Sequence, residues 1–261
     1  MIDKRAVARH FSRAAATYDE AALVQADMAR DLAVLCPALP AAPQLLEIGC
    51  GTGLFTDRLL DRYPAASLTI VDISPAMVEH CRAKYASRAN VRVVEADGEC
   101  YSDDREYDCI VSAATLQWFC DPGAALARYR RQLRPGGVLL FSVLGEGTFI
   151  ELFTAFREAY AGLGIPYVRT QGPPLYAAGF WKEALRGYRL LHGERRIYTQ
   201  YYPEVAAFLR DLRRTGASNA EDRRRETPPA AVRAMLESYR RSWPERIPVT
   251  YEGLFFSAYR S

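Results

Sequence analysis

Two carboxylates frame a run of alternating glycines in the first half of the chain. Glu47 lies two residues before the first of the glycines Gly49, Gly51 and Gly53, and Asp72 ends the next apolar stretch. Glycine at such positions lets a ligand touch the backbone, because a Cβ would block positive φ angles or fill the ligand's space. A carboxylate before the turn suits a cationic group, and Asp72 can accept hydrogen bonds from both hydroxyls of a ribose. The pattern predicts a site for a positively charged ligand that contains a ribose.

The elements that position these residues follow from the apolar pattern. Residues 45–48 read as a buried parallel strand, and helical spacing resumes at Leu54, so the glycines form a strand-to-helix turn. Dinucleotides and S-adenosylmethionine both fit a glycine turn followed by an acid at the end of the next strand. A pyrophosphate at the helix N-terminus disfavours a fixed anion such as Glu47. A ligand with an ammonium and a sulfonium favours one, so the sequence predicts S-adenosylmethionine, with an ordinary tight turn as the alternative.

Two further loops should reach the same place. Asp97 and Gly98 follow a predicted strand at 91–96, and residues 113–118 follow another at 107–112. Ligand sites in open parallel sheets lie at the carboxyl ends of the strands. The residues predicted to bind the cofactor are Tyr18, Glu47, Gly49, Gly51, Gly53, Asp72, Ile73, Met77, Asp97, Gly98 and Ala113.

The N-terminal region is expected to be helical, with one helix at 3–16 and a second that starts at Tyr18 and runs to residue 35. Tyr18 at the joint is either a lid residue over the ligand or a packing tyrosine.

Alternating strands and helices predict one α/β domain over residues 1–261. Its predicted parts are an N-terminal helical cap at 1–43, a cofactor-binding core at 44–144, acceptor or lid insertions at 145–175 and 203–247 around a sixth strand, and a final strand at 248–259.

Composition narrows the class of protein. The chain has 261 residues, 49% of them hydrophobic, which is enough for a full α/β core. The charged N-terminus and the lack of a long apolar run predict a cytoplasmic protein without a membrane span. A net charge of only +3 argues against nucleic acid as a partner. The six cysteines lack metal-ligand spacing, so we expect no metal site and no disulfides. Separately, we expect the protein to be a monomer.

The motifs carry a family resemblance. Residues 47–53 together with 71–74 resemble the first two motifs of class I methyltransferases. The resemblance implies a Rossmann-like fold with a seven-stranded, mostly parallel sheet, a helical N-terminal extension and helical lid insertions. It also implies S-adenosyl-L-methionine as the cofactor, with Asp97 and Gly98 against the adenine.

A narrower resemblance covers almost the whole chain. The segments 9–19, 114–118, 148–149, 208–219, 233–236 and 250–251 look like the malonyl-[acyl-carrier protein] O-methyltransferases of early biotin synthesis. That family implies methylation of the free carboxylate of a malonyl thioester, carried by acyl-carrier protein or coenzyme A. A carboxylate is already ionised near pH 7, so no general base is required. Catalysis can come from alignment of the reacting atoms and exclusion of water.

The acceptor site is expected to use Tyr18, Gln117, Trp118, Arg213 and Arg214. The two arginines either hold the malonyl carboxylate or form a solvated basic stripe that docks an acidic carrier protein, with Arg223, Arg224 and Arg225 nearby. Other readings stay open. One is a methyltransferase for a small free acid such as trans-aconitate, whose family shares the Leu-Gln-Trp segment. A second is a binding module without catalysis, and the weakest is an RNA methyltransferase.

Overall fold

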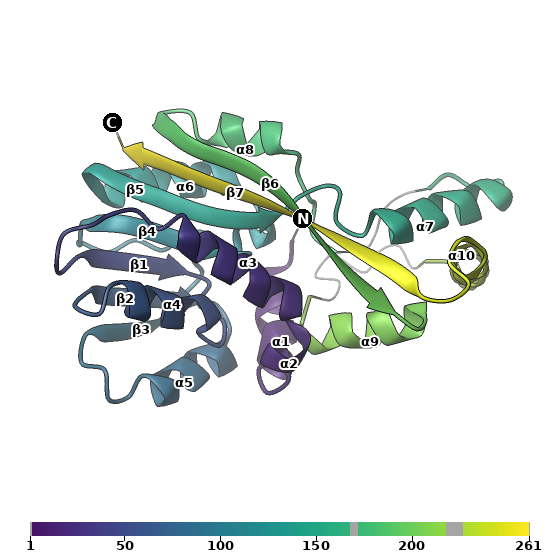
Figure 1. Ribbon diagram of the computed structural model, residues 1–261, viewed down its shortest axis with the longest axis horizontal. Coiled ribbons are helices and arrows are strands. Elements are labelled where there is room, and N and C mark those ends of the chain that lie inside the picture. Colours follow the sequence, from purple (N-terminus) through teal and green to yellow (C-terminus); the bar gives the residue numbers. More distant parts are fainter. Residues whose placement is uncertain (1, 168–171, 218–226, 261) are drawn as a thin grey trace.

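The protein is described here from a computed structural model, which covers residues 2–167, 172–217 and 227–260. A seven-stranded sheet has the strand order β3-β2-β1-β4-β5-β7-β6 (Figure 1). Strands β1 to β5 run parallel, and β7 runs antiparallel to both of its neighbours. The strands are β1 Gln44–Ile48, β2 Ser67–Asp72, β3 Val91–Glu95, β4 Tyr107–Ala113, β5 Leu133–Leu144, β6 Tyr188–Tyr202 and β7 Ile247–Arg260. The predicted Rossmann-like architecture, with its seven-stranded, mostly parallel sheet, is confirmed.

Alternate residues of the central strands point to opposite faces of the sheet, as the period of two requires. Leu45 packs in one core cluster with Met28 and Phe55, and Leu46 packs in another with Leu126. Helices α3 (Leu23–Val34) and α4 (Leu54–Arg62) therefore cover one face. Helices α6 (Pro122–Gln132) and α8 (Ala178–Ala184) cover the other, and α5 (Pro75–Lys84) packs beside β2 and β3.

The N-terminal helical region differs from the prediction in one detail. Helix α1 spans Lys4–Ala14, but the predicted second helix is split into α2 (Tyr18–Ala21) and α3. Ala22 leaves helical geometry at φ −86° and ψ 42°, and its N–H bonds to the carbonyl of Tyr18. This break turns α3 onto the sheet while α1 and α2 stay beside the glycine turn.

A second difference concerns β5. The apolar run at 138–143 predicts a strand that follows a turn at 134–137, but β5 already begins at Leu133. The segment before Val138 is already extended, and Leu133 pairs with Tyr107. The register then shifts before Cys109 pairs with Val138, so the glycines of the expected turn lie in an irregular stretch of strand.

Three helices extend the molecule beyond one end of the sheet: α7 (Ile150–Gly162), α9 (Val205–Arg214) and α10 (Pro229–Ser242). Figure 1 shows them grouped around the far ends of the long strands β6 and β7. They belong to the predicted insertions, and α7 packs against α10. Within the described ranges, no helix combines the length and apolarity that a bilayer crossing needs.

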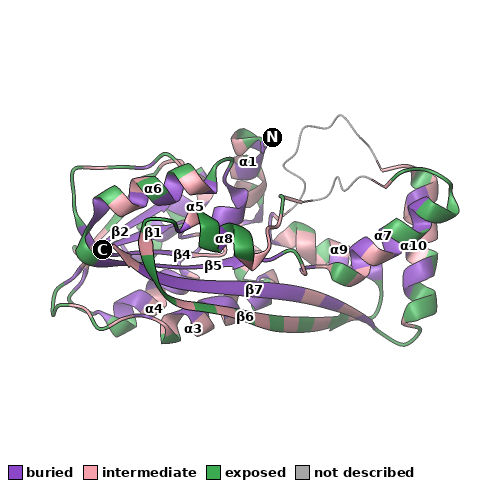
Figure 2. Ribbon diagram, turned by 90° about the horizontal axis from the view of Figure 1, so that it is seen from above, coloured by how far each residue is buried: buried purple, intermediate pink, exposed green. Residues whose placement is uncertain are grey.

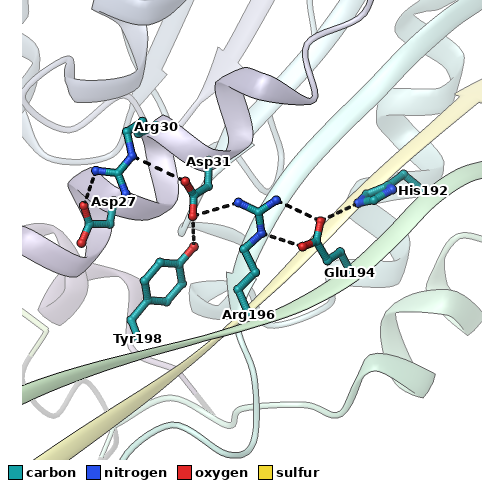
Figure 3. A network of polar contacts seen from close by, with 7 residues as sticks. All are labelled: Asp27, Arg30, Asp31, His192, Glu194, Arg196 and Tyr198. Carbon is teal, nitrogen blue, oxygen red and sulfur yellow. Dashed lines mark hydrogen bonds and ion pairs between the residues drawn. The ribbon is translucent and has the colours of Figure 1, made fainter.

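A charge network fastens α3 to the edge strand β6 (Figure 3). Asp31 accepts a hydrogen bond from the Tyr198 hydroxyl at 2.6 Å and pairs with Arg196 at 3.0 Å. Arg196 also pairs with Glu194, which contacts His192. Burial alone would raise the pKa of Asp31, but the hydrogen bonds from Tyr198 and Arg196 outweigh burial and lower it. The network holds the helical cap in register with the sheet.

Candidate active site

A cavity of about 900 Å³ lies at the carboxyl ends of the parallel strands. Glycine-turn residues, strand ends and the N-terminal helices all contribute to its wall. Of the residues predicted to bind a cofactor, those that line it are Tyr18, Glu47, Gly49, Gly51, Asp72, Ile73, Met77, Asp97, Gly98 and Ala113. The structure thus brings the four predicted loops to one place.

Glu47 is a buried acceptor with unused capacity at the base of this cavity. Its side chain is 1% exposed, and one oxygen, Oε2, accepts a hydrogen bond from the Thr56 hydroxyl of α4 at 2.6 Å. The other oxygen, Oε1, has no donor among the described residues. Burial raises the pKa of Glu47 to about 8, although the Thr56 hydrogen bond opposes the rise. A buried acceptor without a donor is destabilising, so Oε1 fits a ligand that brings a cationic N–H group.

Asp72 is held by the backbone at the end of β2. Its Oδ2 accepts from the amide of Gly51 at 2.9 Å, and its Oδ1 accepts from the amide of Ser74 at 2.8 Å. Burial raises the pKa of Asp72, and these amides counteract part of the rise. An ionised carboxylate offers about four acceptor sites, so Asp72 keeps some acceptor capacity beyond the backbone amides that bond to it. The arrangement fixes the carboxylate and leaves it able to accept from a diol.

The three glycines serve different purposes. Gly51 has φ +52°, and a Cβ there would enter open space, as expected for a close approach of ligand to backbone. At Gly49 a Cβ would lie 2.1 Å from Thr115 Oγ1, so this glycine lets the loop after β4 pack. Gly53 was predicted to bind the cofactor but is absent from the described cavity lining. It caps α4 at φ +88°, where a Cβ would collide with the Tyr85 hydroxyl.

Asp97 faces the cavity from the end of β3 and is shared with the N-terminal helix. Its Oδ1 accepts from the amide of Glu99 at 3.0 Å and from Lys4 Nζ at 3.3 Å. Lys4 also pairs with Glu99 at 2.6 Å. Gly98 must be small, since a Cβ there would lie 2.5 Å from Ile48 Cγ2. The N-terminal extension is thereby tied to the predicted adenine side of the cavity.

Helix α1 and the α1–α2 joint form the roof. Val7, Phe11 and Tyr18 line the cavity, and Ser12 Oγ lies 2.9 Å from Ser74 Oγ of the α5 cap. Burial raises the pKa of the Tyr18 hydroxyl, and the nearby charge of Asp72 adds to the rise. Asp19 accepts a hydrogen bond from Thr52 of the glycine turn. These contacts place Tyr18 in the cavity wall, where a lid residue would lie.

A second cavity of about 1,110 Å³ adjoins the first. Gln25 and Trp118 line both cavities, so these two side chains stand at their junction. The remaining wall comes mainly from α7, α9, α10, the ends of β5 and β7 and the adjoining loops, and it is mostly aromatic and aliphatic. It includes Leu144, Phe149, Leu152, Phe153, Phe156, Leu209, Leu212, Val232, Met235 and Tyr251. None of the lining residues in the described ranges carries a charge.

Gln117 lines the second cavity in the short 3₁₀ turn Leu116–Trp118. It is 3% exposed, and its Nε2 donates to the carbonyl of Ala114 at 2.8 Å, whereas Oε1 has no donor in the described structure. Ala114 has φ +51°, and Phe149 of the second cavity has φ +60°. These are the non-glycine residues with positive φ in the described chain, and each lines one of the cavities. Such strained positions concentrate at ligand sites.

Arg213 and Arg214 line neither cavity. Arg213 is exposed, and Arg214 pairs with Glu20 of α2 and with Asp211. The assignment of these arginines to the acceptor carboxylate stays a prediction that the cavity lining does not support. Arg223, Arg224 and Arg225 lie outside the described residues.

Several lining residues were missed by the sequence reasoning, notably Lys4, Val7, Phe11, Gln25 and Thr52. The spacing of Lys4, Val7 and Phe11 on one helical face was a usable signal, because residues three and four apart share a face. No signal in the sequence shows that this face covers a ligand. Among the described residues there is also no cluster of three His, Cys, Asp or Glu side chains that could hold a metal.

Comparison with known sequences places the chain among methyltransferases. Residues 45–137 match the family described as "Methyltransferase domain". The malonyl-[acyl-carrier protein] O-methyltransferase of Anoxybacillus flavithermus is 36% identical, over 98% of this chain and 97% of that protein. The enzyme of the same name from Halalkalibacterium halodurans is 34% identical, over 97% of each.

Solved structures agree on the fold. The YcgJ protein of Bacillus subtilis superposes with a TM-score of 0.55 at 15% identity, covering 84% of this chain and 92% of that one. The [4+2]-cyclase SpnF gives 0.54 at 18% identity, covering 88% and 78%. A cyclase among the neighbours shows that the fold does not determine the reaction.

Proposed function

The chain belongs to the malonyl-[acyl-carrier protein] O-methyltransferase family, and from that premise we propose the reaction of its own site. It transfers a methyl group from S-adenosyl-L-methionine to the free carboxylate of a malonyl thioester on acyl-carrier protein. The product is the methyl ester thioester, which belongs to an early step of biotin synthesis. The observation that carries the proposal is the junction at Gln25 and Trp118, where a cavity lined by carboxylates meets an apolar one.

The first cavity suits the cofactor. When bound, S-adenosylmethionine supplies an electrophilic methyl group. Glu47 would accept from the amino group through Oε1, and Asp72 would accept from the ribose hydroxyls. Asp97 and Gly98 would contact the adenine, while Ile73, Met77 and Ala113 would pack around it. The donor set supports this, because both Glu47 and Asp72 have acceptor capacity that no described residue uses.

The second cavity suits the acceptor. Its aromatic and aliphatic wall excludes water from the junction and favours the neutral part of an acyl thioester over a second charge. The acceptor carboxylate needs no base, since carboxyl groups are ionised at neutral pH. Gln117 and Trp118 would orient it, and Tyr18 would close the roof above the junction. The chain's contribution is alignment and exclusion of water.

The exposed arginine at the end of α9 then contacts the carrier protein and does not hold the malonyl carboxylate. Arg213 is exposed and lines neither cavity, which supports the docking reading over the anchor reading. Acidic carrier proteins are attracted to such surfaces, and complementary charge mostly accelerates encounter.

The direct test is to incubate the purified protein with S-adenosylmethionine and malonyl-acyl-carrier protein and to analyse both products by mass spectrometry. The proposal expects a malonyl methyl ester on the carrier and an equal amount of S-adenosylhomocysteine. Absence of the ester, with cofactor binding demonstrated separately, would refute it. The Asp72→Ala variant is the matched control, because it should fold and form little ester.

A further inference from the structure

Helix α1 presents two chemically different faces. Lys4, Val7 and Phe11 line the cofactor cavity. Arg5, Arg9 and Arg13 follow one another at a spacing of four residues, and all three are exposed. Residues four apart lie on the same side of a helix, so these arginines form one stripe, called the α1 stripe below. Figure 2 shows α1 at the margin of the molecule with exposed residues on its ribbon.

The stripe has no counter-charge of its own. None of its three arginines forms an ion pair with a described residue, and the segment 4–16 contains no Asp or Glu at all. On α3, by contrast, the exposed Arg30 pairs with Asp27 one turn earlier on the same helix. The stripe thus differs from an ordinary solvated face in which both signs alternate.

The stripe is also unfavourable for the helix that bears it. Like charges four residues apart repel along a helix. Arg5 lies in the first turn, where the helix dipole disfavours a cation, and no acid occupies that turn. Only Arg13, in the last turn, is favourably placed. No described contact compensates for this repulsion within the protein. The arrangement therefore points to a binding partner.

Helix α1 lies beside the second cavity, on the side of the helix away from the stripe. The end of α9 abuts α1, since a Cβ on Gly216 would lie 2.9 Å from the His10 carbonyl and 3.0 Å from Phe11 Cα. The next residue, Ala217, lines the second cavity. On its inner side α1 touches Trp118 at the cavity junction. A partner that binds the outer face of α1 is therefore separated from the two cavities by this one helix.

We propose that the α1 stripe is a docking surface for the acidic carrier protein that delivers the acyl group. The proposal rests on the proposed function and names the surface that its partner uses. Charge complementarity supports it: three unpaired cations meet an acidic protein, and attraction accelerates productive encounter at low salt. Docking on the roof helix also brings the carrier to the segment that encloses the cofactor.

The test compares two acceptors and two triple variants. Arg5→Gln, Arg9→Gln and Arg13→Gln together remove the stripe while keeping good helix formers. The control removes three exposed arginines that precede β2, β3 and β5 at the opposite, amino-terminal side of the sheet: Arg62→Gln, Arg88→Gln and Arg131→Gln. The acceptors are malonyl-acyl-carrier protein and malonyl-pantetheine, which lacks both the carrier and phosphate. Calorimetry with S-adenosylhomocysteine checks that the cofactor site is intact.

The stripe variant should lose kcat/KM for the carrier-protein substrate by about tenfold or more at low ionic strength, and its rate should respond less to salt than that of the wild type. Its rate with malonyl-pantetheine and its cofactor affinity should be unchanged, and the control variant should resemble the wild type with both acceptors. Unchanged kcat/KM for the carrier substrate would overturn the inference. So would an equal loss with both acceptors, or stripe-dependent binding of an RNA duplex without any effect on the carrier reaction. If the wild type methylates neither acceptor, it is the proposed function that fails.

Discussion

Phe11 and Trp118 meet edge to face, with ring centroids 5.5 Å apart and ring planes at 89°. Phe11 belongs to the roof helix α1, whereas Trp118 lies after β4 and lines both cavities. Tyr18 extends the group, with its ring centroid 6.4 Å from that of Phe11. The roof helix of the first cavity and the wall of the second are thus connected through one aromatic contact.

Removal of the Phe11 ring should destabilise the packing of helix α1 over the first cavity. Edge-to-face pairs contribute about 0.5–1.5 kcal/mol beyond area burial, so Phe11→Ala should weaken S-adenosylhomocysteine binding roughly three- to tenfold or more. Isothermal calorimetry measures this loss, with Phe180→Ala of α8 as a control aromatic outside both cavities. Equal affinities for Phe11→Ala and wild type would contradict the assigned role of the roof.

Two variants of Tyr18 distinguish a lid residue from a residue that only packs. If its hydroxyl helps to fix the closed roof, Tyr18→Phe should fold normally and lose turnover. If the ring only packs, Tyr18→Phe should keep its rate, and Tyr18→Ala should lose stability through a cavity. We expect the first result. Thermal melting and initial rates on both variants decide, and a full rate for Tyr18→Phe would rule the lid role out.

Asp72 should dominate cofactor affinity. Asp72→Ala removes up to two charge-assisted hydrogen bonds to the ribose, each worth roughly 1.5–3 kcal/mol. It also frees the amides of Gly51 and Ser74, so circular dichroism must show that the variant is folded. Calorimetry should then show a loss of at least about tenfold in affinity. A folded variant with wild-type affinity is incompatible with the ribose assignment.

Glu47 should make cofactor affinity depend on pH. With its pKa raised by burial to about 8, the free protein holds a proton on Glu47 at neutral pH. Pairing with an ammonium requires the ionised form, so the affinity for S-adenosylhomocysteine should increase as the pH rises from 6 to 8, with release of a proton. Calorimetry in buffers of different ionisation enthalpy measures that release. Buffer-independent enthalpies would count against the pairing.

Glu47→Gln is the control, and it has a stability effect of its own. Between the reference pKa of 4.5 and the raised value near 8, the folded protein binds a proton that the unfolded chain does not. The contribution of Glu47 to stability is therefore largest below 4.5 and is lost as the pH rises towards 8. The variant should lack both this decline and the pH dependence of cofactor affinity.

The cofactor side was largely predictable because its residues lie next to strand ends. The run from Glu47 to Gly51 and the pair Asp97 and Gly98 each follow a recognisable apolar strand, and parallel strands bring such loops to one edge. Gly53 shows the limit of the rule. Its left-handed φ was foreseeable, but its contact with Tyr85 depends on α5 packing against the turn.

The acceptor side could not be read from the sequence in the same way. Phe149, Phe153, Met235 and Tyr251 come from segments far apart in the chain, and their apolar spacing is equally typical of core residues. Arg213 and Arg214 lie in a segment that resembles the family, but the sequence of a helix does not show which of its faces contacts a ligand. Arg214 instead forms an ion pair with Glu20, and only the tertiary structure reveals this contact between α9 and α2.

The most direct measurement of the central claim is a methyl-transfer assay that compares kcat/KM for malonyl-acyl-carrier protein, malonyl-coenzyme A, free malonate and trans-aconitate. The apolar second cavity lacks a charged lining residue in the described ranges, so a second carboxylate should be poorly accepted there. We expect both thioesters to exceed both free acids, with the carrier-protein substrate ahead. Preference for either free acid over both thioesters would contradict the account and leave a methyltransferase of a different acceptor.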